Sequence, residues 1–374
     1  MSKKQIKKGD MPLAIVTTGG SGGHIFPAEA ISRALIDKGI RVAFVTDKRG
    51  QAFQGLKGAE VYRLSAESVT GRSVFGKIKA AVKLYVGVIQ AIMLMYKLKP
   101  AVVVGVGGYA SIPAVLAAHM VRIPVVLHEQ NAVLGRANRF LAQNARLIAT
   151  SFEPTLRVPG EAHQVMVGLP ARSGVLEAIK TPYPDVKKVF RLLVFGGSQG
   201  ARFFSTRLAE ALIALPEQVR AKIELTQQVR PEDRENAEKM YQNAGFKKVE
   251  LKSFFDNMPE LLKQSHLIIG RGGASTLTEL MIVGRPAIIV PLPSAADNHQ
   301  AENARVFCDA GAGWLVVESD FRPKDFAKRL TQLIENPELL RQASVQASRL
   351  ARPNAAEKMA DVVCDIIKGS VHED

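Results

Sequence analysis

The segment LAIVTTGGSGGHIFPAEA, residues 13–30, decides the fold of the first half of the chain. A β-branched apolar run at residues 13–17 leads into the turn GGSGGH (19–24), and a stretch of helical composition follows. Glycines let the backbone adopt positive φ and let a ligand approach it closely. The first turn of the following helix has unpaired N–H groups and a positive dipole end. A strand, a glycine-rich turn and a helix in this order therefore predict a phosphate-binding site.

The same order recurs in the turns GVGGYAS (105–111), GGSQGA (196–201) and GRGGAST (270–276). One such turn alone is weak evidence, because glycines also close ordinary strand–helix connections. Each half of the chain carries two of these turns, in matching order. This repetition predicts two diphosphate-bearing ligands, one for each half.

Short apolar runs alternate with helix-length segments, which predicts parallel sheets covered by helices. The fold class is therefore α/β, with two Rossmann-like doubly wound domains. We expect a basic tail at 1–10, an N-terminal domain at 11–167 and a C-terminal domain at 168–352, with a last helix at about 353–370 packing back on the N-terminal domain. The expected strands are residues 13–17, 42–46, 102–106, 125–128, 191–195, 223–226, 267–270 and 287–291.

The composition restricts the partners. The 374-residue chain has 50 Lys and Arg against 35 Asp and Glu, a net charge of +15, which favours nucleic acid, anionic lipid or phosphorylated ligands. Aromatic residues make up 6% of the chain and no nucleic-acid-binding motif is present, so no nucleic acid partner is expected. The two cysteines are too few for a disulfide framework or a zinc site.

We expect neither a signal peptide nor a membrane span. The apolar run after the first lysines is too short for a signal peptide. Residues 101–121 carry no formal charge, but glycines and Pro113 interrupt them, so we interpret them as strand, turn and helix.

Rival phosphate chemistries lack their motifs. No GxxxxGK[ST] sequence occurs, which excludes a P-loop. Gly20, Gly22 and Gly23 do not keep the dinucleotide spacing, although Asp47 stands near the expected strand end. No DxD pair is present, so we expect no metal and no cofactor, and helix dipoles and basic residues would stabilise a diphosphate instead.

In combination these motifs resemble the MurG family of cell-wall glycosyltransferases, which belongs to family 28. The resemblance covers roughly residues 11–365 and rests on GGSGGH, GGYAS (107–111), HEQN (128–131), GGSQGA, GGASTLTE (272–279) and DNHQ (297–300). It implies a GT-B fold, in which the two domains face each other across a cleft. It also implies inverting transfer of GlcNAc from UDP-GlcNAc to the MurNAc 4-hydroxyl of undecaprenyl-diphospho-MurNAc-pentapeptide. The enzyme would work peripherally on the cytoplasmic face of the plasma (inner) membrane, with a cell-wall synthesis complex as a further partner.

The resemblance also implies which residues bind each substrate. Glu279 would accept hydrogen bonds from the ribose, and Phe255 would contact uracil through its backbone. The residues matched to the UDP-GlcNAc site are Ser21, Gly22, Gly23, Asn131, Arg172, Ser198, Gln199, Phe255, Ala274, Ser275, Thr276, Glu279, His299 and Gln300. Those matched to the acceptor diphosphate are Gly22, Gly23, Gly107, Gly108 and Tyr109.

Two residues are candidates for the catalytic base that takes the proton of the acceptor hydroxyl. His24 ends the first glycine-rich turn where a helix begins, and the ordinary pKa of an imidazole lies near the working pH. Its alternative role is a hydrogen bond to the acceptor diphosphate. Glu129 is the second candidate, and its alternative role is to orient Asn131 or to cap a loop. The sequence does not decide between the two residues, and it favours a structural role for His128.

Residues 72–97 combine lysines with apolar side chains and predict a membrane-surface patch. An anionic phospholipid surface is the expected partner. An ordinary core-packed helix is the alternative for residues 84–96. The residues assigned to the patch are Phe75, Lys77, Ile78, Lys79, Val82, Lys83 and Tyr85.

Other functions stay open at this point. Another GT-B lipid glycosyltransferase or a UDP-GlcNAc epimerase is the nearest rival, and HEQN and GGSQGA argue against both. An NAD-dependent oxidoreductase is a more distant enzyme. A basic lipid-binding module without catalysis is the non-enzymatic alternative, and it leaves the repeated phosphate-type turns without a purpose.

Overall fold

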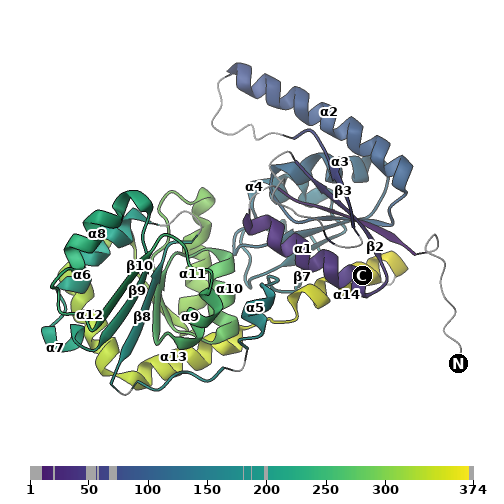
Figure 1. Cartoon of the computed structure of the whole chain (residues 1–374). Coiled ribbons are helices and arrows are strands. Elements are labelled where there is room, and N and C mark those ends of the chain that lie inside the picture. Colours follow the sequence, from purple (N-terminus) through teal and green to yellow (C-terminus); the bar gives the residue numbers. More distant parts are fainter. Residues whose placement is uncertain are drawn as a thin grey trace, which may run out of the picture. The chain divides into compact units, whose positions relative to one another are not determined.

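The computed structural model describes residues 11–19, 22–47, 56, 59–66, 74–179, 181–186, 188–197 and 201–369. It divides the chain into two compact units, shown in Figure 1. Unit 1 comprises residues 1–172 and 354–374, and unit 2 comprises residues 173–353. The tail predicted at residues 1–10 lies outside the described residues.

The predicted domain boundary at 167/168 was placed too early. Residues 164–166 form an edge strand of the unit 1 sheet, and the N–H groups of Val167 and Gly168 donate to Thr150 O at 2.9 and 3.1 Å. These bonds keep the chain in unit 1 as far as Arg172. The chain returns from unit 2 to unit 1 after Pro353 rather than after residue 352.

Unit 1 is built on a parallel sheet of order β3-β2-β1-β4-β5-β6-β7. Alternate residues of each strand face opposite sides, so Ala14 and Val16 join one apolar layer while Leu13 and Ile15 join the other. The strand order reverses between β1 and β4, and ligands of doubly wound sheets bind at such a point. The strands are β1 Leu13–Thr17, β2 Arg41–Thr46, β3 Ala59–Arg63, β4 Val102–Gly105, β5 Val125–Glu129, β6 Leu147–Thr150 and β7 Gln164–Met166.

Helices cover both faces of this sheet. The last helix, α14, packs against α1 and contributes Met359, Val363 and Ile366 to the same apolar layer, so the helix predicted at 353–370 returns to the N-terminal domain as expected (Figure 1). On the other face α2 packs along α3. The helices are α1 Gly22–Asp37, α2 Val74–Leu98, α3 Ile112–Met120, α4 Arg136–Leu141 and α14 Ala355–Lys368, with 3-10 turns at Tyr109–Ser111 and Ala142–Asn144.

Unit 2 repeats the architecture with the order β10-β9-β8-β11-β12-β13, so its switch point lies between β8 and β11. Its strands are β8 Phe190–Phe195, β9 Ile223–Gln228, β10 Lys248–Lys252, β11 Leu267–Gly270, β12 Ala287–Ile289 and β13 Gly313–Leu315. Its helices are α5 Ser173–Leu176, α6 Ala209–Ile213, α7 Glu217–Arg220, α8 Arg234–Tyr241, α9 Met258–Gln264, α10 Ala274–Val283, α11 His299–Asp309, α12 Pro323–Glu335 and α13 Pro337–Leu350, and a π-helical turn, Phe204–Leu208, precedes α6.

Each strand expected from the sequence is present, within two residues at either end. The sequence missed β3, β6, β7, β10 and β13. β3 and β10 are exposed edge strands with charged residues, and β7 and β13 have 3 residues each. Such segments lack the apolar signal of a buried strand.

Candidate functional site

The two glycine-rich turns of unit 1 pack directly on each other at the carboxyl ends of β1 and β4. Gly19 N donates to Gly107 O at 3.2 Å. Gly107 and Gly108 have φ of 82° and 80°, and a Cβ on Gly108 would lie 3.1 Å from Gly19 Cα. Only glycine fits this approach without strain, so packing accounts for part of the motif.

His24 lies in the first turn of α1, and its ring rests on the second glycine-rich turn. A Cβ on Gly107 would meet His24 Cε1 at 3.3 Å and Nδ1 at 3.4 Å. The imidazole is half-buried, and Tyr109, also half-buried, opens the 3-10 turn that follows. The structure therefore brings together His24 and the residues matched to the acceptor diphosphate. Gly22 and Gly23 begin α1, and Ser21 lies outside the described residues.

Glu129, the second candidate base, holds a loop. Its side chain is 3% exposed. Oε1 accepts from Asn131 N at 2.9 Å and from Asn131 Nδ2 at 3.3 Å. Oε2 accepts from Gly135 N at 2.8 Å and from Asn138 Nδ2 at 2.9 Å. With both oxygens committed, the geometry favours the alternative role for Glu129, which is to orient Asn131.

Asn138 was missed by the sequence reasoning. Its Nδ2 donates to His128 O at 3.1 Å as well as to Glu129, so it joins the HEQN strand end to α4. No motif around Asn138 signals this role, because its partners are nine and ten residues away. His128 is structural, as the sequence favoured: Nε2 bonds Gly168 O at 3.0 Å, and burial lowers the pKa of the imidazole.

In unit 2 the last glycine-rich turn lies under α11. Asn303 Nδ2, another residue that the sequence did not reveal, donates to Gly272 O at 3.0 Å. A Cβ on Gly272 would lie 2.2 Å from Gln300 O. The turn leads into α10, whose first residue is Ala274 and whose N-cap is Gly273. Ser275 is exposed and Thr276 half-buried, which leaves this helix N-terminus accessible beside the turn.

Three other residues matched to the donor have defined surroundings. Glu279 on α10 is 6% exposed, so it is not a solvated surface glutamate. His299 Nδ1 bonds Ala296 O at 2.7 Å, and Gln300 Oε1 accepts from Leu292 N at 3.0 Å. Asp297 and Asn298 reach positive φ of 52° and 58° just before α11 begins. The DNHQ motif is therefore a strained turn that starts a helix next to the glycine-rich turn.

The remaining donor candidates differ in what surrounds them. Phe255 is buried, with Lys252 Nζ at 5.6 Å from its ring centroid. Phe254, which the sequence reasoning did not select, is 67% exposed. Arg172 is exposed and ends the first segment of unit 1. Ser198 and Gln199 lie outside the described residues.

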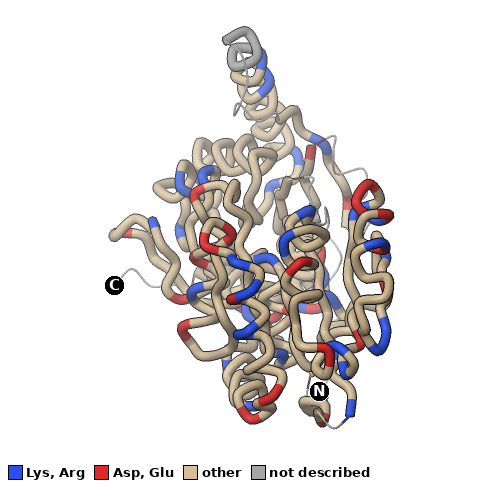
Figure 2. Tube along the Cα trace, turned by 90° about the vertical axis from the view of Figure 1, so that its left-hand side faces the viewer, with Lys and Arg blue, Asp and Glu red and all other residues tan. Residues whose placement is uncertain are grey.

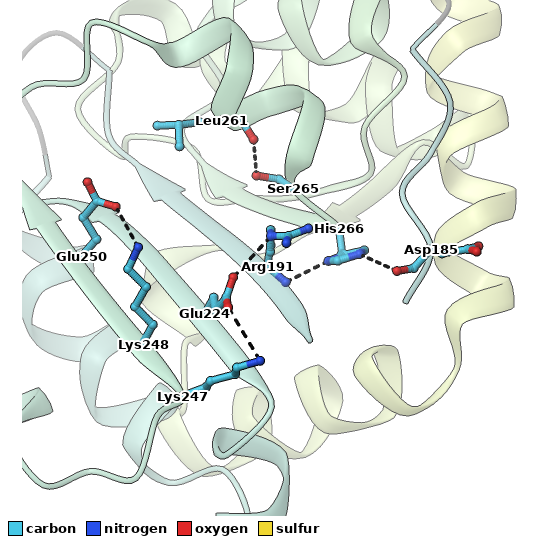
Figure 3. Close-up of polar contacts among 9 residues, drawn as sticks. All are labelled: Asp185, Arg191, Glu224, Lys247, Lys248, Glu250, Leu261, Ser265 and His266. Carbon is cyan, nitrogen blue, oxygen red and sulfur yellow. Dashed lines mark hydrogen bonds and ion pairs between the residues drawn. The ribbon is translucent and has the colours of Figure 1, made fainter. Parts of the chain in front are cut away.

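Arg271 and His266 of unit 2 serve the fold. Arg271, inside GRGGAST, pairs with Glu318 and donates to Val290 O at 3.0 Å. His266 lies at the opposite, amino end of the sheet, where Nδ1 accepts from Arg191 N at 2.8 Å and Nε2 bonds Asp185 O at 3.3 Å (Figure 3). Burial lowers the pKa of His266 to about 4.

Comparison with known proteins agrees with the two units. The model of the glycosyltransferase family 28 N-terminal domain matches residues 14–150, and that of the family 28 C-terminal domain matches residues 191–361. The UDP-N-acetylglucosamine–N-acetylmuramyl-(pentapeptide) pyrophosphoryl-undecaprenol N-acetylglucosamine transferase of Paramagnetospirillum magneticum is 44% identical over 95% of this chain and 97% of its own length. The protein of that name from Rhodospirillum rubrum is 44% identical over 94% of this chain and 92% of its own.

Solved structures show the same fold. Acinetobacter baumannii MurG superposes with a TM-score of 0.80 at 29% identity, covering 95% of this chain and 99% of its own. A UDP-GlcNAc 2-epimerase from Neisseria meningitidis reaches a TM-score of 0.65 at 16% identity over 95% of this chain and 100% of its own, a likeness of fold alone. The chain has the GT-B fold and belongs to glycosyltransferase family 28, and within it to the MurG family.

Proposed function

We propose that this chain transfers GlcNAc from UDP-GlcNAc to the MurNAc 4-hydroxyl of undecaprenyl-diphospho-MurNAc-pentapeptide, with inversion and release of UDP. One observation carries the proposal: each unit presents a pair of glycine-rich turns at the switch point of its own sheet. Each substrate contains one diphosphate, and a helix N-terminus beside such a turn favours negative charge. The names of the relatives describe this same donor sugar and acceptor.

UDP-GlcNAc is assigned to unit 2. The N–H groups at the start of α10, from Ala274 to Thr276, take the diphosphate, and Glu279 accepts hydrogen bonds from the ribose. Gln300 and His299 reach the transferred sugar from the start of α11. Helix dipoles aimed at the leaving UDP stabilise its growing charge in the transition state.

The lipid-linked acceptor is assigned to unit 1. Gly107, Gly108 and the first turn of α1 contact its diphosphate. His24 takes the proton of the attacking hydroxyl, because its ring lies at these turns while the carboxylate of Glu129 is occupied by four N–H donors. Glu129 positions Asn131, which contacts the transferred sugar.

We further propose that the chain works peripherally on the cytoplasmic face of the plasma membrane, beside other enzymes of cell-wall synthesis. The support is α2, which carries lysines and no acidic residue along its length and lies at the top of the view in Figure 2. Tyr85, Met93 and Tyr96 are 69%, 68% and 69% exposed along it. The core-packed alternative for residues 84–96 therefore fits only the opposite face, where Ala91 and Met95 are buried.

The patch assigned from the sequence is a part of this surface. Lys79, Val82, Lys83 and Tyr85 are exposed or half-buried on α2, whereas the side chains of Phe75, Lys77 and Ile78 lie outside the described residues. Met120 on α3 and Phe140 on α4 are further exposed apolar residues of unit 1. Within the described residues, one segment, Lys79–Leu98, is long and apolar enough to cross a membrane by length and composition alone. Because α2 packs against α3, we propose that it lies along the membrane surface and does not cross the membrane.

The experiment is to incubate the chain with UDP-GlcNAc, with and without lipid-linked MurNAc-pentapeptide, and to measure UDP release and the glycolipid product. We expect UDP release only with the acceptor, together with a product one GlcNAc heavier. Release of UDP and conversion of the sugar without any acceptor would favour an epimerase instead. Transfer to diacylglycerol would favour a different lipid glycosyltransferase.

A further inference from the structure

Gln228, the last residue of β9, binds the loops on both sides of its strand. Its Oε1 accepts a hydrogen bond from Gly196 N at 3.1 Å. Its Nε2 donates to Ser253 O at 3.2 Å. Gly196 opens the turn after β8, and Ser253 opens the loop after β10. Because β9 lies between β8 and β10 in the sheet, one side chain at its carboxyl end reaches both loops.

The primary amide suits this task because it carries an acceptor and a donor on the same carbon. The Gln228 side chain is 7% exposed, and a buried polar group of this kind keeps its hydrogen bonds. Both bonds are present in the chain by itself. The distance between the two loops is therefore fixed before any ligand arrives.

The neighbouring Gln227 has a different role. Its Nε2 donates to Phe204 O at 3.1 Å, and its Oε1 accepts from Tyr241 OH at 2.7 Å. These partners belong to the π-helical turn and to α8, which cover the sheet. Gln227 thus stabilises the packing of unit 2, and among the described residues it bonds neither loop, which makes it a matched control for Gln228.

We infer that Gln228 is a positioning residue for the nucleotide: it fixes the spacing between Gly196, at the start of the diphosphate-binding turn after β8, and the loop that Ser253 opens after β10, to which the uracil contact of Phe255 is assigned. The inference rests on the proposed function, which assigns UDP to unit 2. A ligand that touches both loops gains affinity from their fixed spacing. A fragment that touches only one loop gains none.

Calorimetric titration of UDP, uridine and inorganic pyrophosphate into the full chain tests this. For Gln228→Met we expect UDP to bind about tenfold more weakly, as for two lost hydrogen bonds. The affinities for uridine and for pyrophosphate should each change by less than about threefold, because neither ligand spans the two loops. In turnover, KM for UDP-GlcNAc should rise about tenfold while kcat stays within about threefold. Gln227→Met should lower Tm but leave the ratios between the affinities for UDP, uridine and pyrophosphate unchanged.

A second variant tests the hydrogen bonds themselves. Gln228→Glu keeps the acceptor, but its ionised carboxylate has no donor for Ser253 O. Protonation of that carboxyl supplies an O–H donor. Burial at this position raises the pKa of the introduced carboxyl above its ordinary value. UDP affinity of this variant, relative to the unchanged chain, should therefore recover as pH falls from about 8 to about 5. A relative affinity that stays constant over this range would overturn the inference.

Two other outcomes would also overturn it. Equal weakening of UDP, uridine and pyrophosphate by Gln228→Met would indicate general damage to the site. Full UDP affinity in that variant would make the bridge irrelevant to binding and would leave the proposed function intact. Failure of the unchanged chain to bind UDP would instead overturn the proposed function, and this inference with it.

Discussion

The two units share one strand order over six strands, to which unit 1 adds β7, and their glycine-rich turns follow equivalent strands. The glycines of these turns, however, contact different parts of the structure. In unit 1, Gly108 packs against Gly19, so the two turns contact each other, and the His24 ring packs on both. In unit 2, Gly272 packs against the backbone of Gln300, so the start of helix α11 contacts the turn. The contrast shows how one scaffold presents an imidazole on one unit and polar helix ends on the other.

The covering helices differ as well. In unit 2, α8 carries ion pairs between residues four apart, Arg234 with Glu238 and Lys239 with Glu235, as expected for a helix facing water. In unit 1, α2 exposes tyrosine, methionine and lysine with no acidic residue. The two helices thus present different surfaces: α8 carries charge pairs suited to water, and α2 carries the surface that we propose to contact an anionic membrane.

The largest effect is expected from removing the proposed catalytic base, which lies in unit 1. His24→Ala should lower kcat by about 10²–10⁴-fold, because it removes the proposed base of unit 1. KM for UDP-GlcNAc should change little, since the donor belongs to unit 2. Steady-state kinetics with both substrates varied measure this. Unchanged kcat with a raised KM for the lipid acceptor would assign His24 to diphosphate binding instead.

The glycine contacts of the two units predict measurable losses of folding stability. Gly108→Ala should cost about 2–3 kcal/mol, because an added Cβ meets Gly19 and φ is positive. Gly272→Ala should cost at least as much, because its Cβ would collide with Gln300 O. Gly160→Ala is the control, since a Cβ there meets no atom within 4 Å. Urea unfolding measures all three, and equal stabilities would contradict the packing argument.

The helix surfaces predict a smaller, salt-dependent effect. Reversing Lys79 and Lys83 together to Glu should weaken binding to vesicles rich in phosphatidylglycerol by at least about tenfold at low salt. Reversing Lys324 and Lys328, an exposed pair with the same spacing on α12 of unit 2, should change binding much less. Vesicle co-sedimentation compares the two. An equal loss in both variants would mean that net charge, and not the α2 surface, governs binding.

The buried histidines predict a modest pH effect in each unit. Burial lowers the pKa of His128 in unit 1, and that of His266 in unit 2 to about 4. Between about pH 6.5 and 4 the unfolded chain binds a proton that folded His266 does not, so stability falls as pH falls. His266→Asn keeps an acceptor for Arg191 N but removes the titrating imidazole. Between about pH 6.5 and 4 the Tm of this variant should therefore fall by a few degrees less than the Tm of the unchanged chain. A profile as steep as that of the unchanged chain would contradict the assignment.

The sequence predicted what depends on local pattern. Buried strands such as β1 and β11 have the bounds expected from their apolar runs, and the turns lie at the strand ends where the motifs stand. The role of Gln228 could not be predicted, because its partners lie 32 and 25 residues away. Asn303 reaches Gly272 across 31 residues in the same manner. Contacts of this range are made by the fold and leave no local signal.

The misplaced domain boundary has a related cause. Gly168 and Pro170 look like a break in regular structure, but the chain at that point is still bonded to β6 through Thr150. Local composition signals a turn, and only the sheet pairing shows which unit the turn belongs to.

If the glycine-rich turns of each unit hold one diphosphate, amide NMR of the isotope-labelled chain will show it residue by residue. UDP should shift the amides of Gly196, Gly197 and residues 272–276, and leave those of Gly107 and Gly108 in place. A diphosphate-bearing acceptor analogue should do the reverse, moving Gly19, Gly107 and Gly108. Both ligands shifting the amides of the same unit, or neither shifting any of these turns, would contradict the account.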